Sequence, residues 1–190
     1  MNKQELQRYY QNKDKIESSI LKSLIETPEI EVIYGARSVN AQLPDYLKSY
    51  TEDYDIYSEN PEDTAKAMEK TLDKVFDMNA FEVLPAKHKG TFRVFSKVTG
   101  KNVADVSLPN RSISYISVDG VNYATLDEQV VNARKALADS RSWYRWAKDR
   151  DALQRIKLAP RGPRRRRVNI MKVKKRPQKA TLSDPLVTLW

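Results

Sequence analysis

The sequence of 190 residues predicts an α+β domain, in which a mixed sheet is flanked by helices, followed by a basic extended tail. Three observations lead to this prediction. Helical and strand-like segments alternate through the first half of the chain, and strands joined by tight turns fill the middle. The hydrophobic periodicity then stops near residue 158, where Pro, Arg and Lys become frequent. We therefore expect one domain over 1–158 and a tail over 159–190.

The domain opens with a helix over 3–26, in which Ile16, Ile20 and Leu24 recur at helical spacing. Thr27-Pro28 ends this helix, because the residue before a proline disfavours helical backbone. The core of the domain is expected over 28–125. Its first elements are a strand over 30–34, a helix or loop broken at Pro44, a strand over 54–57 and a helix capped by Asn60.

Hairpins and closing helices make up the second half of the predicted domain. Asp119-Gly120 between two strand-like segments is the strongest hairpin signal in the chain, and Thr99-Gly100-Lys101 indicates another. Helical periodicity returns over 126–157, where two closing helices are expected. The strands of this half are predicted over 81–84, 91–98, 102–108, 113–118 and 121–124.

The net charge of +9 belongs entirely to the tail. The residues after 158 hold ten Lys or Arg and one acid, which leaves 24 of the 34 bases and 24 of the 25 acids in the domain. Such an arm favours nucleic acid without base specificity, an acidic protein surface or a large protein assembly. A solubilising tail and a plain nucleic-acid-binding module are the alternatives. The candidate tether residues are Arg164, Arg165, Arg166, Arg167, Lys172, Lys174, Lys175 and Arg176.

The composition excludes several classes of protein. With no cysteine and one histidine, the chain excludes a disulfide scaffold, a thiol nucleophile and a multi-histidine metal site. No apolar segment approaches the ~20 residues of a membrane helix. The first residues lack the apolar stretch of a secretory signal, so we expect a protein of the cytoplasm, the nucleus or an enclosed particle.

Two neighbouring segments carry the candidate chemistry. Asp53 and Asp55 alternate on a short strand, so both carboxylates face one side, roughly 7 Å apart along it. A hard divalent cation relieves the repulsion between such carboxylates, whereas a turn acid beside a surface acid is the alternative interpretation. Gly35 lies between a strand and a helix start, where a phosphate can approach the backbone. Asp105, between apolar neighbours on a later strand, is the candidate third carboxylate.

These features together resemble the nucleotidyltransferase fold of the polymerase β superfamily: an apolar strand, Gly35, the pair Asp53-Tyr54-Asp55 and a later strand Asp. Residues 34–40 and 52–56 are most similar to the poly(A)-polymerase-like branch found in large DNA viruses. Residues 119–126, followed by 145–151, are similar to the segment that leads into the closing helices of that family. The resemblance covers about residues 28–157.

The resemblance implies a magnesium-dependent enzyme that transfers a nucleoside monophosphate from NTP to a hydroxyl acceptor. Asp53, Asp55 and Asp105 would be the catalytic residues and would bind two Mg²⁺ ions, and Asp105 would help to activate the attacking hydroxyl. For the NTP, the resemblance implies that Gly35 and Ser38 line the triphosphate. Arg37 would contact a phosphate.

The sequence also departs from the family. Ala36 replaces the usual second Gly or Ser, and the chain has no room for the large second domain that grips base and RNA in poly(A) polymerases. These departures favour an alternative function. The protein would then be a catalytically inactive, nucleotidyltransferase-like structural protein of a virion, such as a minor capsid protein, or of another large assembly, tethered by its basic tail.

The closing helices contain residues that we interpret structurally. Trp143, Tyr144 and Trp146 are typical of packing in the core and at its rim rather than of a base-stacking platform. Lys148, Asp149 and Asp151 indicate charge pairs on a helix surface.

Overall fold

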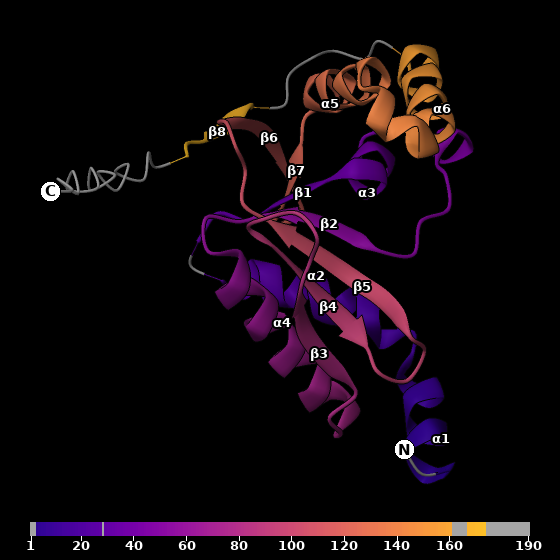
Figure 1. The fold of residues 1–190 in the computed structure, drawn as a ribbon, viewed down its shortest axis with the longest axis vertical. Coiled ribbons are helices and arrows are strands. Elements are labelled where there is room, and N and C mark those ends of the chain that lie inside the picture. The colour runs from indigo at the N-terminus through magenta and orange to yellow at the C-terminus, as the bar shows by residue number, and fades with distance from the viewer. Residues whose placement is uncertain (1–2, 28, 161–166, 174–190) are drawn as a thin grey trace, which may run out of the picture.

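The structure is a computed structural model that describes residues 3–27, 29–160 and 167–173. Its strands are β1 (Val32–Tyr34), β2 (Tyr54–Tyr57), β3 (Phe81–Pro85), β4 (Thr91–Ser96), β5 (Lys101–Ser107), β6 (Ile113–Val118), β7 (Val121–Ala124) and β8 (Asn169–Met171). They form one sheet with the order β3-β4-β5-β2-β1-β7-β6-β8 (Figure 1). The pairs β2–β5 and β1–β7 are parallel and the other pairs are antiparallel, so the predicted mixed sheet is confirmed.

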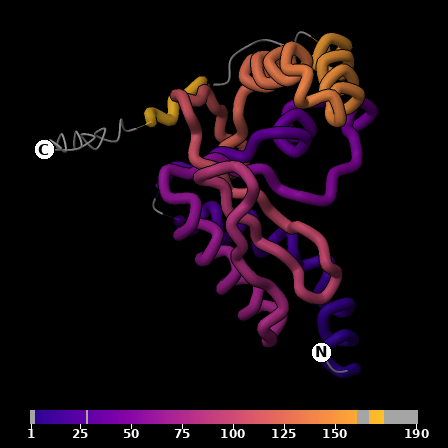
Figure 2. The backbone as a smooth tube through the Cα atoms, in the orientation of Figure 1, coloured from indigo at the N-terminus to yellow at the C-terminus, as the bar shows by residue number. Residues whose placement is uncertain are grey.

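The helices form two groups. They are α1 (Lys3–Asn12), α2 (Lys15–Glu26), α3 (Gly35–Asn40), α4 (Pro61–Phe76), α5 (Leu126–Ala138) and α6 (Trp146–Leu158), with the 3₁₀ helices η1 (Asp45–Leu47) and η2 (Ser140–Arg145). Helices α2 and α4 pack on each other and on the sheet, whereas α3, α5 and α6 gather at the other end of the molecule (Figures 1 and 2).

The main hydrophobic core lies under α4. Met68, Leu72 and Phe76 recur every four residues along this helix and are fully buried against the sheet. Burial of each such side chain contributes about 1.5–3 kcal/mol. Asp77, in left-handed conformation at φ 50°, ends the helix.

Most predicted elements are observed, but the N-terminal helix is not continuous. The predicted helix over 3–26 is divided into α1 and α2 at Lys13 and Asp14. Tyr9 of α1 packs on Phe76 and Phe81, with ring centroids 5.1 and 6.2 Å apart, and this contact fixes α1 beside the far end of α4. Within the described ranges, no helix is long and apolar enough to cross a membrane.

Part of the segment that the sequence assigns to the tail belongs to the sheet. Strand β8 pairs with β6 in the register Ile113↔Met171, and Met171 is buried in a second hydrophobic cluster. The sheet therefore extends past the predicted domain end at 158. Two tether candidates, Arg167 and Lys172, flank β8 and are exposed. The others, Arg164, Arg165, Arg166, Lys174, Lys175 and Arg176, lie outside the described residues.

Candidate functional site

A row of polar residues crosses the sheet on the face opposite α4. Tyr34, Asp55 and Asp105 are direct partners on β1, β2 and β5, and Arg93 of β4 is the partner of Asp105. Direct partners on adjacent strands point to the same side, so these four side chains share one face. The structure thus brings together Asp55 and Asp105, which are 50 positions apart in the sequence.

Asp55 is the most perturbed acid of this face. Burial raises its pKa to about 7, and the negative charges of Asp53 and Asp105 act in the same direction. The positive charges of Lys148 and Arg145 oppose this rise. Near neutral pH the Asp55 carboxyl is therefore close to the midpoint between its protonated and ionised forms.

Gly35 makes room for the Asp55 carboxyl. It begins α3 at φ 67°, and a Cβ atom at this position would collide with Oδ2 of Asp55. Its backbone N–H donates a hydrogen bond to Oε1 of Gln129, with 3.0 Å between nitrogen and oxygen. Within the described residues, Nε2 of Gln129 is buried without a hydrogen-bond partner. Because a Cβ atom at position 35 would collide with Asp55, a residue larger than glycine would displace the Asp55 carboxyl.

Asp55 and Gly35 border a cavity of about 420 Å³ between the sheet and the closing helices. This volume is within the usual range of small-molecule sites. The strands contribute Tyr34 and Tyr57 to its wall, and their rings stack with centroids 3.9 Å apart. Helix α5 contributes Gln129. The cavity is large enough for a ligand that contacts the acid face and the helices together.

The helical wall of the cavity is cationic. Arg145 is paired with Asp149, with 2.9 Å between Nε and Oδ2. Lys135 and Lys148 also line the cavity, and neither forms an ion pair with any other described residue. The interpretation of Asp149 as a surface charge is wrong, because this residue is only 5% exposed. The two free ammonium groups favour an anionic ligand.

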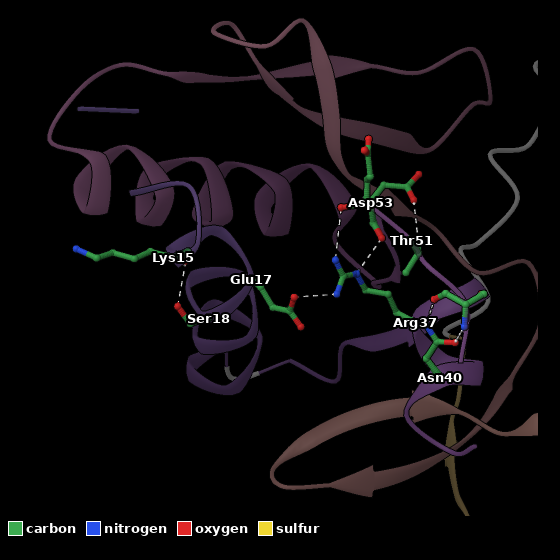
Figure 3. Close-up of polar contacts among 9 residues, drawn as sticks. Lys15, Glu17, Ser18, Arg37, Asn40, Thr51 and Asp53 are labelled. Atoms are coloured by element: carbon green, nitrogen blue, oxygen red, sulfur yellow. Dashed lines mark hydrogen bonds and ion pairs between the residues drawn. The ribbon is translucent and has the colours of Figure 1, made fainter. Parts of the chain in front are cut away.

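Arg37 does not line the cavity, and its guanidinium points toward Glu17 and the segment of Asp53 (Figure 3). Its guanidinium lies 3.7 Å above the ring of Tyr54, and Nη1 is 3.2 Å from Oε2 of Glu17 on α2. Its Nε donates to the backbone carbonyl of Asp53 at 3.1 Å. Arg37 thus ties α2 and α3 to the segment that carries Asp53. This position gives no support to the predicted phosphate contact.

Ser38 is engaged inside the fold. Its hydroxyl donates to the carbonyl of Ala124 at 2.6 Å, and the side chain is fully buried. The amide of Gln42 donates to the same carbonyl at 2.8 Å. Ser38 therefore fastens α3 to the end of β7, and it does not line the cavity. Its predicted contact with a triphosphate stays a prediction without structural support.

The oxygen ligands of the site suit magnesium in part. Mg²⁺ is commonly held by one or two carboxylates together with substrate phosphates, and Asp53 and Asp55 supply carboxylates. Asp105 is already paired with Arg93, with 3.4 Å between Oδ1 and Nε, and this oxygen accepts no hydrogen bond from described residues. No three His, Cys, Asp or Glu within the described ranges could together hold a metal ion. Of the three acids, Asp55 lines the cavity, whereas Asp53 and Asp105 do not. An ion at Asp53 and Asp55 and a second ion at Asp105 both stay predictions.

The fold is nucleotidyltransferase-like. The chain is similar to the crystal structure of the Megavirus polyadenylate synthase, with a TM-score of 0.60 and 18% sequence identity over 77% of this chain. The similarity covers 31% of the synthase, so the chain spans about a third of its length. At this identity the likeness shows the fold alone. No family model and no curated protein sequence matches the chain.

Sequence reasoning missed the helical side of the site. Gln129 and Lys135 stand in an ordinary amphipathic helix, where no motif marks them, and only the packing of α5 against α3 and α6 brings them to the cavity. For Arg145 and Asp149 a signal was present, since the two residues are four positions apart and form an ion pair on one helix face.

Proposed function

We propose that the protein is a magnesium-dependent nucleotidyltransferase that transfers a nucleoside monophosphate from NTP to a hydroxyl acceptor. The observation that carries the proposal is Asp55, an acid with a raised pKa that lines a cavity of ligand size together with Lys148. The nucleotidyltransferase-like fold supports the same function. The resemblance of residues 34–40 and 52–56 to the poly(A)-polymerase-like branch of large DNA viruses also supports the proposal.

The acid face would bind the metal and activate the acceptor. Asp53 and Asp55 would hold Mg²⁺, which, when bound, neutralises charge on the transferred phosphoryl group. Arg37 would keep Asp53 in place through its backbone carbonyl. Asp105, which forms an ion pair with Arg93, would accept the proton of the attacking hydroxyl.

The helical wall would bind the nucleotide. Lys148 and Lys135 would attract the triphosphate, because neither ammonium is neutralised by another described residue. Gln129 holds the backbone N–H of Gly35, so this donor reaches a phosphate only if the amide of Gln129 moves. Tyr34 and Tyr57 offer an apolar surface at the other side of the cavity.

Incubation with labelled NTP and Mg²⁺ tests the function. We expect transfer by the wild type and a loss of more than ~100-fold in Asp55→Asn, since even partners that only orient metal ligands contribute about 10- to 100-fold. Asp63→Asn, which changes an exposed acid of α4, is the matched control and should keep full activity. Absence of transfer to RNA, protein and small-molecule acceptors, together with absence of metal-dependent NTP binding, would contradict the proposal.

A second candidate is an inactive structural component of a virion or another assembly. Two observations favour it: the N–H of Gly35 is occupied by Gln129, and Asp105 already has a cationic partner in Arg93. In this case a chain shortened after Val173, in which Arg164, Arg165, Arg166 and Arg167 are also changed to Ala, keeps β8 but loses seven of the eight tether candidates. It should fold as before and fail to enter the assembly. Unchanged incorporation of the shortened chain would contradict this second function.

A further inference from the structure

The 3₁₀ helix η2 lines the cavity with some of its side chains and exposes others to solvent. Residues three apart in a 3₁₀ helix point the same way, and Ser142 and Arg145, which are three apart, both line the cavity. Trp143 and Tyr144 occupy the other sides of the same turn and are 70% and 69% exposed. Two adjacent aromatic rings therefore stand in solvent beside the cavity.

The neighbouring Trp146 shows that this exposure is particular to two of the three aromatic residues. The indole N–H of Trp146 donates to the carbonyl of Ala136 at 3.1 Å and joins α6 to α5. The structural interpretation of the aromatic residues is thus confirmed for Trp146 and wrong for Trp143 and Tyr144. Large rings that stand together in solvent are uncommon on a protein surface unless they bind something.

The segment that carries the rings is strongly basic. Residues 140–158 contain six Lys or Arg and two Asp. Arg145 and Arg155 use these two acids as ion-pair partners. Lys148, Arg150 and Lys157 have no ion pair with any described residue. The exposed rings are therefore accompanied by cations that remain available for an external polyanion.

We propose that Trp143 and Tyr144 form a stacking surface for a single-stranded nucleic acid that leads into the cavity. Aromatic rings stack on any unpaired base, and neighbouring cations bind the phosphates, a combination typical of single-strand binding without sequence preference. In a duplex the bases already stack on one another, so the rings distinguish single strands from duplexes. An acidic peptide would use the cations but would gain little from two rings.

This inference extends the proposed function by naming the class of acceptor, and only the acceptor role rests on that function. The end of a strand lying on Trp143 and Tyr144 would be near Arg145 and Lys148, which line the cavity that Asp55 borders. The terminal hydroxyl of the strand would be the attacking group. Binding itself requires neither NTP nor metal, so it can be measured separately from transfer.

The test measures binding of a labelled single strand of about 12 nucleotides, as RNA and as DNA, to the full chain without NTP or metal. The double variant Trp143→Ala/Tyr144→Ala should bind single strands about tenfold more weakly, the loss expected when stacking is removed. Duplex affinity should change less than twofold, because the cations of the closing helices and the tail remain. Trp143→Phe/Tyr144→Phe should keep most of the affinity.

Tyr10→Ala is the matched control, because it removes a 58% exposed ring from α1 at the other end of the molecule (Figure 1). It should leave every affinity unchanged. Equal losses for single strand and duplex, or a single-strand loss below twofold in the alanine variant, would overturn the proposal. Displacement of the single strand by an acidic peptide at equal concentration would also overturn it. Asp55→Asn should still bind the strand, so a failure of transfer alone leaves this proposal standing.

Discussion

The two faces of the central strands differ although they alternate residue by residue. Ile33, Ile56 and Ala104 are fully buried in the core that includes the apolar residues of α4, whereas Asp55 and Asp105 occupy neighbouring positions on the opposite face. The apolar face stabilises the fold through burial, and the polar face carries charges that weaken it. Substitutions one position apart in β2 should therefore have opposite consequences for stability and for activity.

An acid with a raised pKa on each side of the sheet makes the comparison sharper. Glu31, which precedes β1, is 3% exposed and accepts a hydrogen bond from Thr64 of α4 at 2.8 Å. Burial raises the pKa of Glu31 to about 7, the value that Asp55 also reaches. Glu31 is enclosed beside α4, whereas Asp55 borders the cavity. Glu31 and Asp55 thus have similar pKa values, but Glu31 is enclosed by the fold, whereas Asp55 is accessible to a ligand in the cavity.

The largest effect on stability is expected for the apolar face. Ile56→Ala should lower the free energy of unfolding by about 2–5 kcal/mol, because it leaves a cavity in a fully packed core. Asp55→Asn, one position earlier, removes a buried charge and should not lower stability at pH 8. Denaturant titration of both variants checks this, and a loss in Asp55→Asn as large as that in Ile56→Ala would contradict the division between the faces.

Glu31 should make stability depend on pH. Its folded pKa of about 7 lies above the ordinary value of 4.5, so folding binds a proton between these values and stability falls as pH rises through them. The loss approaches about 3 kcal/mol between pH 4 and pH 8. Glu31→Gln should remove this dependence when both proteins also carry Asp55→Asn, which eliminates the similar titration of Asp55. Identical pH profiles of stability would contradict this assignment.

A comparison of Gly35 with Gly100 separates the effect of contact with Asp55 from the effect of left-handed backbone. Both have φ 67°, but a Cβ atom at Gly100 would meet nothing within 4 Å. Gly100→Ala should therefore cost about 1–2 kcal/mol for left-handed backbone alone. Gly35→Ala should cost more and should also reduce transfer, because the methyl group displaces the Asp55 carboxyl. Equal stability and full activity of both variants would exclude a role for this contact.

The smallest expected effect concerns Arg37, which contacts Tyr54 and the backbone of Asp53. Arg37→Lys keeps the charge but loses the planar contact with Tyr54 and the hydrogen bond to Asp53, at a cost of about 1 kcal/mol. Arg8→Lys is the control, since Arg8 also binds a backbone carbonyl and a carboxylate, at Asp77. Only Arg37→Lys should lower kcat with KM for NTP unchanged. Equal kcat values in the two variants would contradict a positioning role.

The sequence predicts much of the fold because its signals are local. The turn at Asp119-Gly120, with φ of 52° and 81°, and the strand over 54–57 are found where predicted. Asp105 was a candidate because it stands between apolar neighbours on a predicted strand, but its pairing with Asp55, 50 positions away, was not predicted. Gly35 and the pair Asp53 and Asp55 were also identified as site candidates from local sequence patterns.

Packing between distant segments could not be predicted in the same way. Arg37 and Ser38 were expected at a phosphate, but Glu17 and the carbonyl of Ala124, far away in the sequence, engage them. Strand β8 was missed because three residues within a basic, proline-containing segment carry no strand signal. The strand is recognised only in the structure, where Met171 packs in the second hydrophobic cluster. Hydrophobic periodicity predicts on which face of a helix or strand a side chain lies. It does not predict which distant residue that side chain will contact.

Binding of Mn²⁺ in the presence of a non-hydrolysable NTP, followed by calorimetric titration at pH 8, tests the central claim that the polar face of β2 holds a metal and a nucleotide. The wild type and Glu31→Gln should bind the metal with similar affinity, whereas Asp55→Asn should bind it more than ~100-fold more weakly. Equal affinities in Asp55→Asn and the wild type, or no metal-dependent binding by the wild type, would contradict the claim.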